Sequence, residues 1–221
     1  MNIQDNGIEI IDNFLPQEII DEIINEVSLF DGIDSKHGIR NAEKKFSSIS
    51  QLIDSDIIQA RVKEILGSKP MLVRAIFFDK TPEKNWLVSW HQDKTISVNT
   101  KSNITGWGPW TIKDGVNHVQ PDLSVLNQMI TFRLHLDATD ENNGCLKVIP
   151  NSHQKGIIQQ SDIRNIVNTD QPYDCIANAG DLVLMRPHIL HSSSKSTQPS
   201  HRRVVHLEFS NYNLPMGLKW A

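Results

Sequence analysis

The spacing of apolar residues changes once along this chain, near Pro70, and that change limits the folds available to it. Before Pro70, apolar residues recur at helical spacing within Asn13 to Leu29 and again from Ile53 to Leu66, where Gly67 ends the pattern. After Pro70, they recur at every second position in short segments separated by turn residues. We predict strands at residues 71–79, 86–92, 129–137, 145–149, 173–178, 181–186 and 203–210.

Several short strands preceded by helices predict a mainly β fold, a sandwich or barrel with flanking N-terminal helices. We expect one domain over residues 1–221, with a helical part at about 13–67 and a β core at about 71–210. The segment 99–127 carries several Gly and Pro residues and is predicted to be irregular. Because long irregular segments in compact domains are often functional, we predict a lid-like insertion at about 99–127.

Composition limits the partners that we expect. The net charge is -4 and Lys and Arg are scattered, so no nucleic-acid partner is expected. No apolar run reaches membrane-spanning length and the N-terminal residues are polar, so we expect no membrane association and a cytoplasmic location. Two cysteines are too few for a disulfide scaffold. A small-molecule partner is the expectation, and the oligomeric state stays open.

The triplet His91-Gln92-Asp93 ends the predicted strand 86–92. Residues two apart in a strand point to the same side, so this imidazole and carboxylate can share one metal ion. A second imidazole must come from elsewhere among the nine histidines. We favour His191, which follows the strand 181–186 and precedes a Ser-rich turn, and His188 and His206 are its rivals.

Two imidazoles and one carboxylate leave open coordination positions, which suits iron(II) that must bind a cosubstrate and oxygen. Zinc hydrolases also use two histidines and a carboxylate. The triplet alone therefore leaves both metals open.

Four further motifs occur in a fixed order along the chain. They are the segment Asn143 to His153, the segment Gly180 to Met185, the triplet His191-Ser192-Ser193, and Arg202. In this order they resemble the phytanoyl-CoA dioxygenase family of iron(II)- and 2-oxoglutarate-dependent oxygenases. The resemblance extends from about Gly7 to Phe209.

The resemblance implies a double-stranded β-helix, a jelly-roll fold of the cupin kind. It implies that His91, Asp93 and His191 are the metal ligands and the catalytic centre, with Fe(II), 2-oxoglutarate and O2 as the reactive partners. Arg202, which lies 11 residues after His191, corresponds to the family arginine that holds the distal carboxylate of 2-oxoglutarate through paired hydrogen bonds. Ser193 corresponds to the serine that shares this carboxylate.

The reaction implied by the resemblance is hydroxylation of a substrate coupled to release of succinate and CO2. Related halogenases lack the carboxylate ligand, so Asp93 favours hydroxylation over halogenation. Two alternatives stay open: a non-catalytic sensor that binds metal and 2-oxoglutarate, and a zinc-dependent hydrolase or isomerase on a similar barrel. Together, the triad and Arg202 favour an enzyme.

The predicted core strands carry unexpected charges. Arg133 and His135 alternate with apolar residues on one face of the strand 129–137, Arg74 is in phase with Ile76 and Phe78, and Lys94 follows Asp93. These residues predict a pocket for a small polar or anionic substrate. The alternative is that each charge pairs with a nearby carboxylate or with solvent.

Trp107 and Trp110 lie in the predicted insertion. As parts of a lid they would lay an indole ring over the substrate. As structural residues they would anchor the segment to the barrel, and the sequence leaves both roles open. No motif indicates a site for coenzyme A.

Overall fold

The computed structural model describes residues 1–30, 38–67, 70–197 and 201–221. Its elements are, in chain order, β1 (Ile8–Ile11), α1 (Gln17–Ser28), β2 (Ile39–Arg40), α2 (Ala42–Lys45), α3 (Ser47–Asp54), α4 (Asp56–Leu66), β3 (Met71–Lys80), β4 (Val88–His91), β5 (Ile96–Val98), β6 (Trp110–Lys113), β7 (Val116–Val119), α5 (Leu123–Leu126), β8 (Met129–His135), β9 (Leu146–Val148), a 3-10 helix (Ser152–Lys155), α6 (Gln160–Thr169), β10 (Tyr173–Cys175), β11 (Leu182–Met185), β12 (His191–Ser193) and β13 (Arg202–Ser210).

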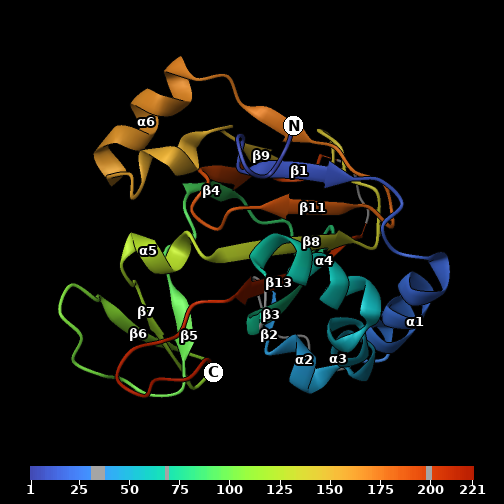
Figure 1. Ribbon diagram of the computed structural model, residues 1–221. Helices are drawn as coiled ribbons and strands as arrows, with labels where there is room; N and C mark the ends of the chain where they lie inside the picture. The colour runs from blue at the N-terminus through green and yellow to red at the C-terminus, as the bar shows by residue number, and fades with distance from the viewer. Residues whose placement is uncertain (31–37, 68–69, 198–200) are drawn as a thin grey trace.

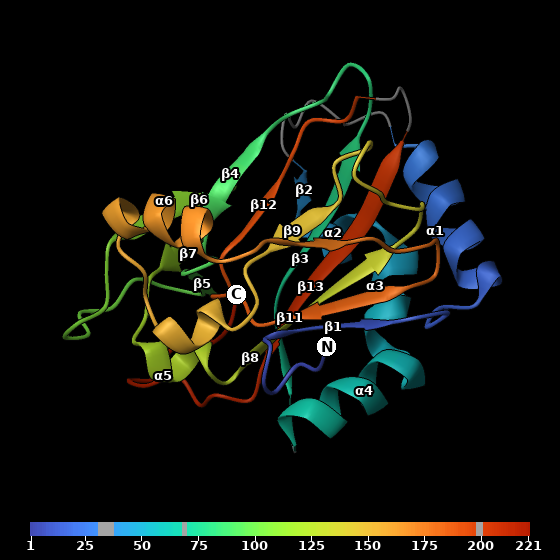
Figure 2. The same cartoon turned by 90° about the horizontal axis from the view of Figure 1, so that it is seen from above.

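Two antiparallel sheets form the body of the molecule (Figure 1). The large sheet has the strand order β1-β11-β8-β13-β3-β2, and the small sheet has the order β10-β9-β12-β4. Figure 2 shows β4, β12 and β9 lying over β3 and β13, with helices α1 and α3 at the far side of the large sheet. This mainly β, jelly-roll arrangement with N-terminal helices matches the predicted fold class.

The outer face of the large sheet packs against the N-terminal helices. Phe132 and Leu134 of β8 are fully buried in one apolar cluster with Ile20 and Ile23 of α1. Burying a side chain of this size stabilises the fold by about 1.5–3 kcal/mol. Because strand residues alternate between faces, the polar residues of the same strands point inward, between the two sheets. The interior between the sheets is therefore free to hold a polar site.

The predicted helix at 53–66 is wrong in one respect, because the structure divides it into α3 and α4. Ser55, between them, has an extended backbone with φ -67° and ψ 150°. Its amide donates to the carbonyl of Leu52, and its hydroxyl donates to the same carbonyl at 2.6 Å. Asp56 then begins α4 with an acidic side chain in the first turn, which suits the helix dipole.

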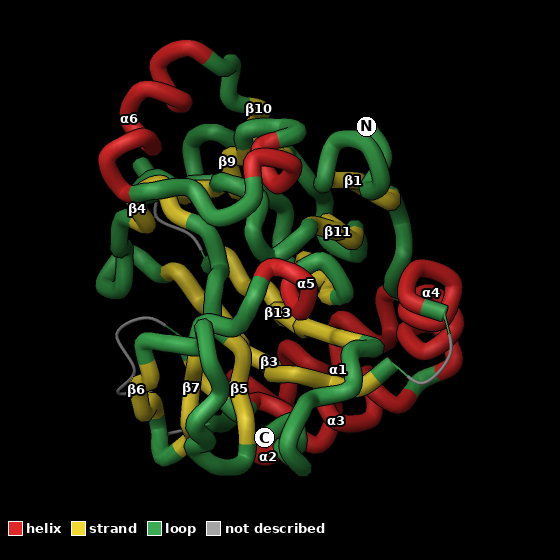
Figure 3. The backbone as a smooth tube through the Cα atoms, turned by 60° about the vertical axis from the view of Figure 1, so that its left-hand side comes forward, coloured by secondary structure: helices red, strands yellow, loops and turns green. Residues whose placement is uncertain are grey.

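The predicted irregular segment at 99–127 is also wrong, because it contains β6, β7 and α5. With β5, these strands form a third sheet in the order β5-β7-β6, seen beside β3 in Figure 3. Asp114 and Gly115 join β6 to β7 with φ values of 48° and 77°. A two-residue hairpin turn with positive φ at both positions favours an Asp-Gly pair. That dipeptide was the local signal for a hairpin.

The seven strands predicted after Pro70 are all present, with small differences at their ends. The predicted strand 173–178 ends at Cys175 in β10, and Ala177 forms only an isolated bridge with Thr139. The short strands β1, β2, β5 and β12 and the helices α2 and α6 were not predicted, and β12 replaces the turn expected after His191. Within the described ranges, no helix is both long enough and apolar enough to cross a bilayer.

Candidate metal and cosubstrate site

Two histidines face each other across neighbouring strands of the small sheet. His91 ends β4, and its cross-strand partner is His191 of β12, with ring centroids 4.2 Å apart. Asp93 follows two residues after β4, with Oδ1 lying 3.6 Å from Nε2 of His91 and Oδ2 lying 3.5 Å from Nε2 of His191. Two imidazole nitrogens and a carboxylate thus converge as the ligands of one metal ion do.

Backbone carbonyls orient both imidazole rings. Nδ1 of His91 lies 2.8 Å from the carbonyl oxygen of Ser89, and Nδ1 of His191 lies 2.9 Å from that of Ile189. A carbonyl can only accept, so each Nδ1 carries the proton and each Nε2 presents a lone pair toward Asp93. This is the tautomer that a metal ligand needs.

The protonation states of His191 and Asp93 also suit a metal. Burial lowers the pKa of His191 to about 4, so this imidazole is neutral near pH 7. Burial opposes ionisation of Asp93, but its interactions with the imidazoles of His191 and His91 outweigh burial and hold the pKa of Asp93 well below its usual range. Metal ions bind neutral imidazole and ionised carboxylate.

Gln92 fixes the turn between His91 and Asp93. Its side-chain amide donates to the carbonyl oxygens of His188 at 2.6 Å and Gly156 at 2.8 Å, and its side-chain oxygen accepts from the amide of Ile158 at 2.8 Å. The amide of Asp93 donates to the carbonyl of Pro187 at 2.9 Å. Gln92 points away from the side chains of His91 and Asp93 because strand residues alternate, and its hydrogen bonds hold this turn against the segments that follow Pro187 and Lys155.

The two rival histidines lie in other surroundings. His188 is buried and its ring stacks edge-on with that of His153 at 6.0 Å, outside the pocket that contains His191. His206 lines that pocket, but Nη1 of Arg133 lies 3.1 Å from its Nδ1, and its Nε2 lies 3.1 Å from Oε1 of Glu208. Since arginine can only donate, Nδ1 of His206 accepts and Nε2 donates to the carboxylate.

A second group of possible ligands consists of Asp93, His206 and Glu208, whose donor atoms also lie within 4.8 Å of one another. In this group, Nε2 of His206 and the carboxylate of Glu208 already have other partners. Nε2 of His206 donates a hydrogen bond to Oε1 of Glu208, and Oε2 of Glu208 lies 2.9 Å from Nε of Arg74. The group of His91, Asp93 and His191 keeps its Nε2 atoms available and is the better candidate for a metal site.

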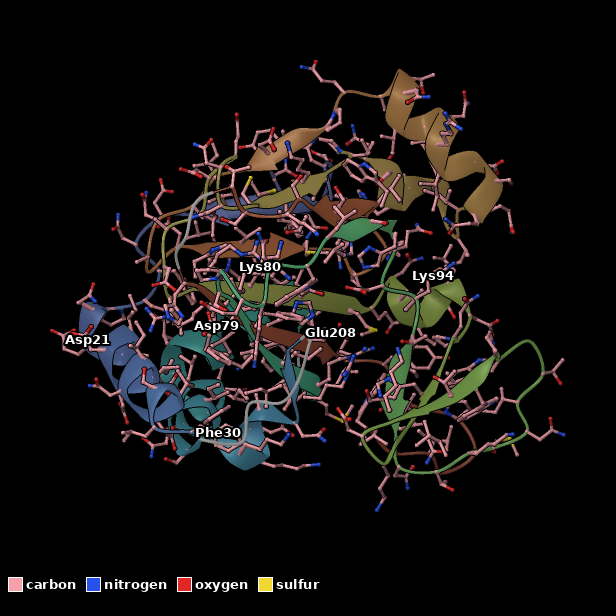
Figure 4. The ribbon with its side chains drawn as sticks, turned by 180° about the vertical axis from the view of Figure 1, so that it is seen from behind. Asp21, Phe30, Asp79, Lys80, Lys94 and Glu208 are labelled. Atoms are coloured by element: carbon pink, nitrogen blue, oxygen red, sulfur yellow. The ribbon has the colours of Figure 1, made fainter. Side chains whose placement is uncertain are left out.

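Two buried cations lie beside the metal site on adjacent strands of the large sheet. Lys80 ends β3 and pairs in register with Arg202, the first residue of β13. They are 1% and 4% exposed, and Figure 4 labels Lys80 between the sheets. Nζ of Lys80 donates to Oγ of Ser193 at 2.9 Å, and Nη1 of Arg202 lies 3.4 Å from the same oxygen. Serine and the two cations thus form one cluster.

Gly144 closes the other side of this cluster. Its carbonyl oxygen accepts from Arg202 and, at 2.8 Å, from the hydroxyl of Ser193. Its φ is +76°, and a Cβ there would lie 2.3 Å from the carbonyl oxygen of Ser194. Only glycine fits this position, which explains why the Asn143 to His153 segment carries it.

The cluster lacks a negative charge. Among the described residues, no carboxylate lies within ion-pair distance of Lys80, Arg202 or Arg133, and Nε of Arg202 has no hydrogen-bond partner. Burial, followed by Arg202 and Arg133, lowers the pKa of Lys80 to about 7, and burial and Arg133 lower that of Arg202 to about 10. Unpaired buried charges are costly, so the site is built for an anion. A carboxylate of 2-oxoglutarate fits it.

One pocket of about 190 Å³ contains the three candidate metal ligands together with Arg202, Arg133 and Ser193, whereas Lys80 lies behind Ser193 and does not line it. Its lining consists of Arg40, Arg74, Ile76, Phe78, Trp86, Val88, His91, Asp93, Thr95, Lys113, Arg133, Leu146, His191, Ser192, Ser193, Arg202, His206 and Glu208.

The pocket contains some of the residues predicted to bind substrate and excludes others. Arg133 and Arg74 line it. His135 faces the same side of β8 but is fully buried with neither ring nitrogen bonded, and it does not reach the pocket. Lys94 follows Asp93 but lies outside the lining, toward α5 in Figure 4. Trp107 and Trp110 also lie outside it.

Five residues of this region were not predicted to take part: Arg40, Lys80, Lys113, His206 and Glu208, of which His206 was considered only as a metal ligand. For three of them, the alternation of side chains along a strand could have indicated that they face the interior between the sheets. Lys80 is in phase with Arg74, Ile76 and Phe78, and His206 and Glu208 are in phase with Arg202. Nothing local in the sequence indicates Arg40 or Lys113, because the fold brings them to the pocket.

Trp107 belongs to an apolar cluster. It packs with Val73, Ile96 and Leu126, with 8% of its surface exposed. We expect Trp107→Ala to lower the free energy of unfolding by about 3 kcal/mol, as loss of a buried aromatic ring does. Ile112→Ala, in the neighbouring strand β6 but at a side chain that is 73% exposed, should change it by less than about 0.5 kcal/mol. Urea unfolding measures both, and equal stability of the two variants would contradict the packing role.

Comparison with protein families finds a match over residues 3–204 to the model of phytanoyl-CoA dioxygenase (PhyH). The chain belongs to this family. The resemblance seen in the ordered motifs is thereby confirmed. A search of curated proteins gives no significant match.

Several solved structures share the fold at low sequence identity. The epimerase SnoN, in complex with Fe3+, alpha ketoglutarate and nogalamycin RO, has a TM-score of 0.73 at 13% identity, covering 97% of this chain and 88% of its own. HygX from Streptomyces hygroscopicus, with nickel and 2-oxoglutarate bound, has a TM-score of 0.68 at 13% identity, covering 94% and 84%. AviO1 from Streptomyces viridochromogenes Tue57 has a TM-score of 0.68 at 16% identity, covering 96% and 93%. Family membership and these neighbours support oxygenase-type activity that depends on iron and 2-oxoglutarate.

Proposed function

We propose that this protein is an iron(II)- and 2-oxoglutarate-dependent dioxygenase that hydroxylates a small polar or anionic molecule and releases succinate and CO2. One observation carries the proposal: the group of His91, Asp93 and His191 shares a pocket with Ser193 and with the buried guanidinium of Arg202, which has no carboxylate partner among the described residues. A zinc hydrolase needs the two imidazoles and the carboxylate, but it does not need a buried guanidinium without a counter-ion.

The roles of the residues follow from their positions. His91, Asp93 and His191 would hold the iron, and Arg202, with Ser193 and Lys80, would hold the distal carboxylate of 2-oxoglutarate. When bound, iron and 2-oxoglutarate together supply the oxidising chemistry. The protein's part is to fix both and to hold the substrate carbon beside them while excluding bulk water.

The substrate end of the pocket is polar. Arg133 is buried over the ring of Phe78, with its Cζ 5.8 Å from the ring centroid, and it donates to His206. Arg74 bridges Glu208 and the carbonyl oxygen of Thr95. These bonds hold the two guanidinium groups at fixed positions in the pocket wall, which favours a substrate with polar or negatively charged groups over a purely apolar chain.

The test begins with binding. Anaerobic addition of Fe(II) and 2-oxoglutarate to the protein should produce a visible charge-transfer absorption, which zinc does not give. Admitting oxygen should then release succinate, at a rate that rises when a true substrate is present. Product mass decides the reaction type, because hydroxylation adds one oxygen atom whereas epimerisation leaves the mass unchanged.

Three outcomes separate the alternatives. Absorption and succinate release together support the oxygenase. Absorption without succinate release from any candidate substrate favours a sensor of 2-oxoglutarate. Hydrolytic activity with zinc and no absorption with iron would overturn the proposal.

A further inference from the structure

Cationic side chains from three separate elements meet at one end of the pocket. Arg40 ends β2, Arg74 lies in β3 and Lys113 ends β6, and all three line the pocket. The same three residues also line a small adjoining cavity. Arg40 and Lys113 are partly open to solvent, whereas Arg133 is buried. Arg40 and Lys113 therefore mark the mouth of the pocket.

Positive charge exceeds negative charge in this part of the pocket. Apart from the metal-binding residues and Arg202, the fully charged lining side chains are four cations and one carboxylate: Arg40, Arg74, Lys113 and Arg133 against Glu208. Glu208 is already paired with Arg74 at 2.9 Å. In the described part of the chain Lys113 has no ion pair or hydrogen bond of its side chain. The excess charge thus remains available to a ligand.

The only carboxylate paired with Arg40 among the described residues is weakly held. Oδ2 of Asp114 lies 3.5 Å from Nη1 of Arg40, and the two side chains are 54% and 36% exposed. Exposed ion pairs of this kind contribute about 0–1 kcal/mol. An incoming anion can therefore replace Asp114 at Arg40 at little cost.

Neighbouring groups respond to the same positive potential. Burial, followed by Arg74 and Arg40, lowers the pKa of Lys113. Burial, followed by Arg74, Lys113 and Arg40, lowers the pKa of the buried His118 imidazole to about 4. Both shifts agree with a cluster of like charges that an anion would relieve.

Strand register locates this cluster relative to the metal site. In the large sheet, His206 of β13 pairs with Ile76 of β3, and Ile76 pairs with Arg40 of β2. Two strand spacings, or about 10 Å, therefore separate Arg40 from His206 along the sheet. Asp93 lies close to His206. The backbone of Arg40 is thus two strands away from the residue that lies beside the metal site.

We propose that Arg40 and Lys113 form an anion subsite, so that the substrate carries a carboxylate, sulfate or phosphate group at the end away from the carbon that is oxidised. Arg40 offers a planar fork of donors and Lys113 a mobile point charge, a combination that suits an oxyanion. The inference rests on the proposed function for its term "substrate", but anion binding at these two residues is a property of the protein alone.

The first test measures binding without turnover. Protein loaded with zinc and saturated with 2-oxoglutarate is titrated with methyl phosphate and followed by phosphorus NMR, with acetate and methyl sulfate as competitors. Saturable binding is expected, and the competition ranks the three oxyanions. Arg40→Gln and Lys113→Gln should each weaken it about three- to fivefold, as removal of one exposed charge contact does.

Matched variants make this result specific. Lys101→Gln removes an exposed lysine from the same 99–127 segment and should leave the affinity unchanged. Lys113→Arg keeps the charge and should retain binding. Absence of saturable binding to the wild-type protein, or equal affinity of the wild type and the double variant, overturns the subsite.

The second test uses turnover and separates this inference from the proposed function. A panel of small acids, phosphate monoesters, neutral alcohols and amines is screened for faster succinate release. Anionic compounds should be preferred, and Lys113→Gln should raise their KM while leaving kcat and the KM for 2-oxoglutarate unchanged. Preference for amines or neutral alcohols overturns the inference. Loss of succinate release and of the iron absorption in the wild-type protein would instead overturn the proposed function, whatever the NMR titration gives.

Discussion

Replacing Asp93 by alanine is expected to abolish succinate release and to weaken iron binding by more than about 100-fold. Changing groups that merely support a metal ligand already costs about 10- to 100-fold in affinity, and Asp93 would itself be a ligand. Its two oxygens lie 3.6 and 3.5 Å from the Nε2 atoms of His91 and His191, so no other carboxylate in the described structure can take its place without moving. Iron affinity and the Fe(II)–2-oxoglutarate absorption measure the effect.

The control is Asp162→Ala, which removes a carboxylate from the first turn of α6, outside the pocket. It should leave iron binding and succinate release unchanged. Asp93→Ala should keep the wild-type melting temperature within a few degrees, because Asp93 has no partner in the apolar core. Retention of iron affinity by Asp93→Ala would contradict the role of Asp93 as a ligand, both with His91 and His191 and in the second group with His206 and Glu208.

Local sequence patterns predicted the parts of the fold that depend on short-range periodicity. Phe132 and Leu134 pack against helices on one face of β8, and Arg133 lines the pocket on the other, as the alternation in the sequence indicates. The hairpin of β6 and β7 was missed because its strands are short and partly exposed, so that only the Asp114-Gly115 turn marks them. Three-residue strands such as β5 carry too few side chains for a period to be visible.

The residues of the candidate site also divide into those that sequence patterns could identify and those that only the fold brings to the pocket. His91 and Asp93 are two residues apart, and the motif order indicated His191 and Arg202, so these four could be named before the structure. Lys80 could have been named from strand phase, because it continues the alternation of Arg74, Ile76 and Phe78. The other residues reach the pocket through cross-strand register, which the sequence does not show. Arg40, for example, lies at the pocket because β2 pairs with β3, with Arg40 opposite Ile76.

Trp107 shows the limit of residue-type reasoning. An indole in a Gly-rich segment fits a lid and a structural anchor equally well, and only its neighbours separate the two. Its burial with Val73, Ile96 and Leu126 places it in the core between β5 and α5. His135 is a similar case, because it has the inward phase of Arg133 but lies one row further along β8, beyond the pocket wall.

Arg202→Met is expected to raise the KM for 2-oxoglutarate about tenfold to 150-fold. A hydrogen bond to a charged group contributes about 1.5–3 kcal/mol, and each 1.4 kcal/mol is a factor of ten. The guanidinium of Arg202 is buried without a carboxylate partner in the described protein, so removing it should not lower the stability of the cosubstrate-free protein. Arg202→Lys should restore only part of the affinity, because an ammonium lacks the planar fork.

Arg203 is the matched control, since it is the same residue type one position along β13 and points to the other face. Its Nε and Nη2 donate to the two oxygens of Asp137 at 2.8 and 2.7 Å, and it does not line the pocket. Arg203→Met should therefore lower the free energy of unfolding by about 1–2 kcal/mol while leaving the KM for 2-oxoglutarate unchanged. Initial rates of succinate formation and urea unfolding of both variants give the four values required. If Arg203→Met raised KM and Arg202→Met lowered only stability, the proposed binding site for 2-oxoglutarate would be wrong, because the two faces of β13 would have exchanged their roles.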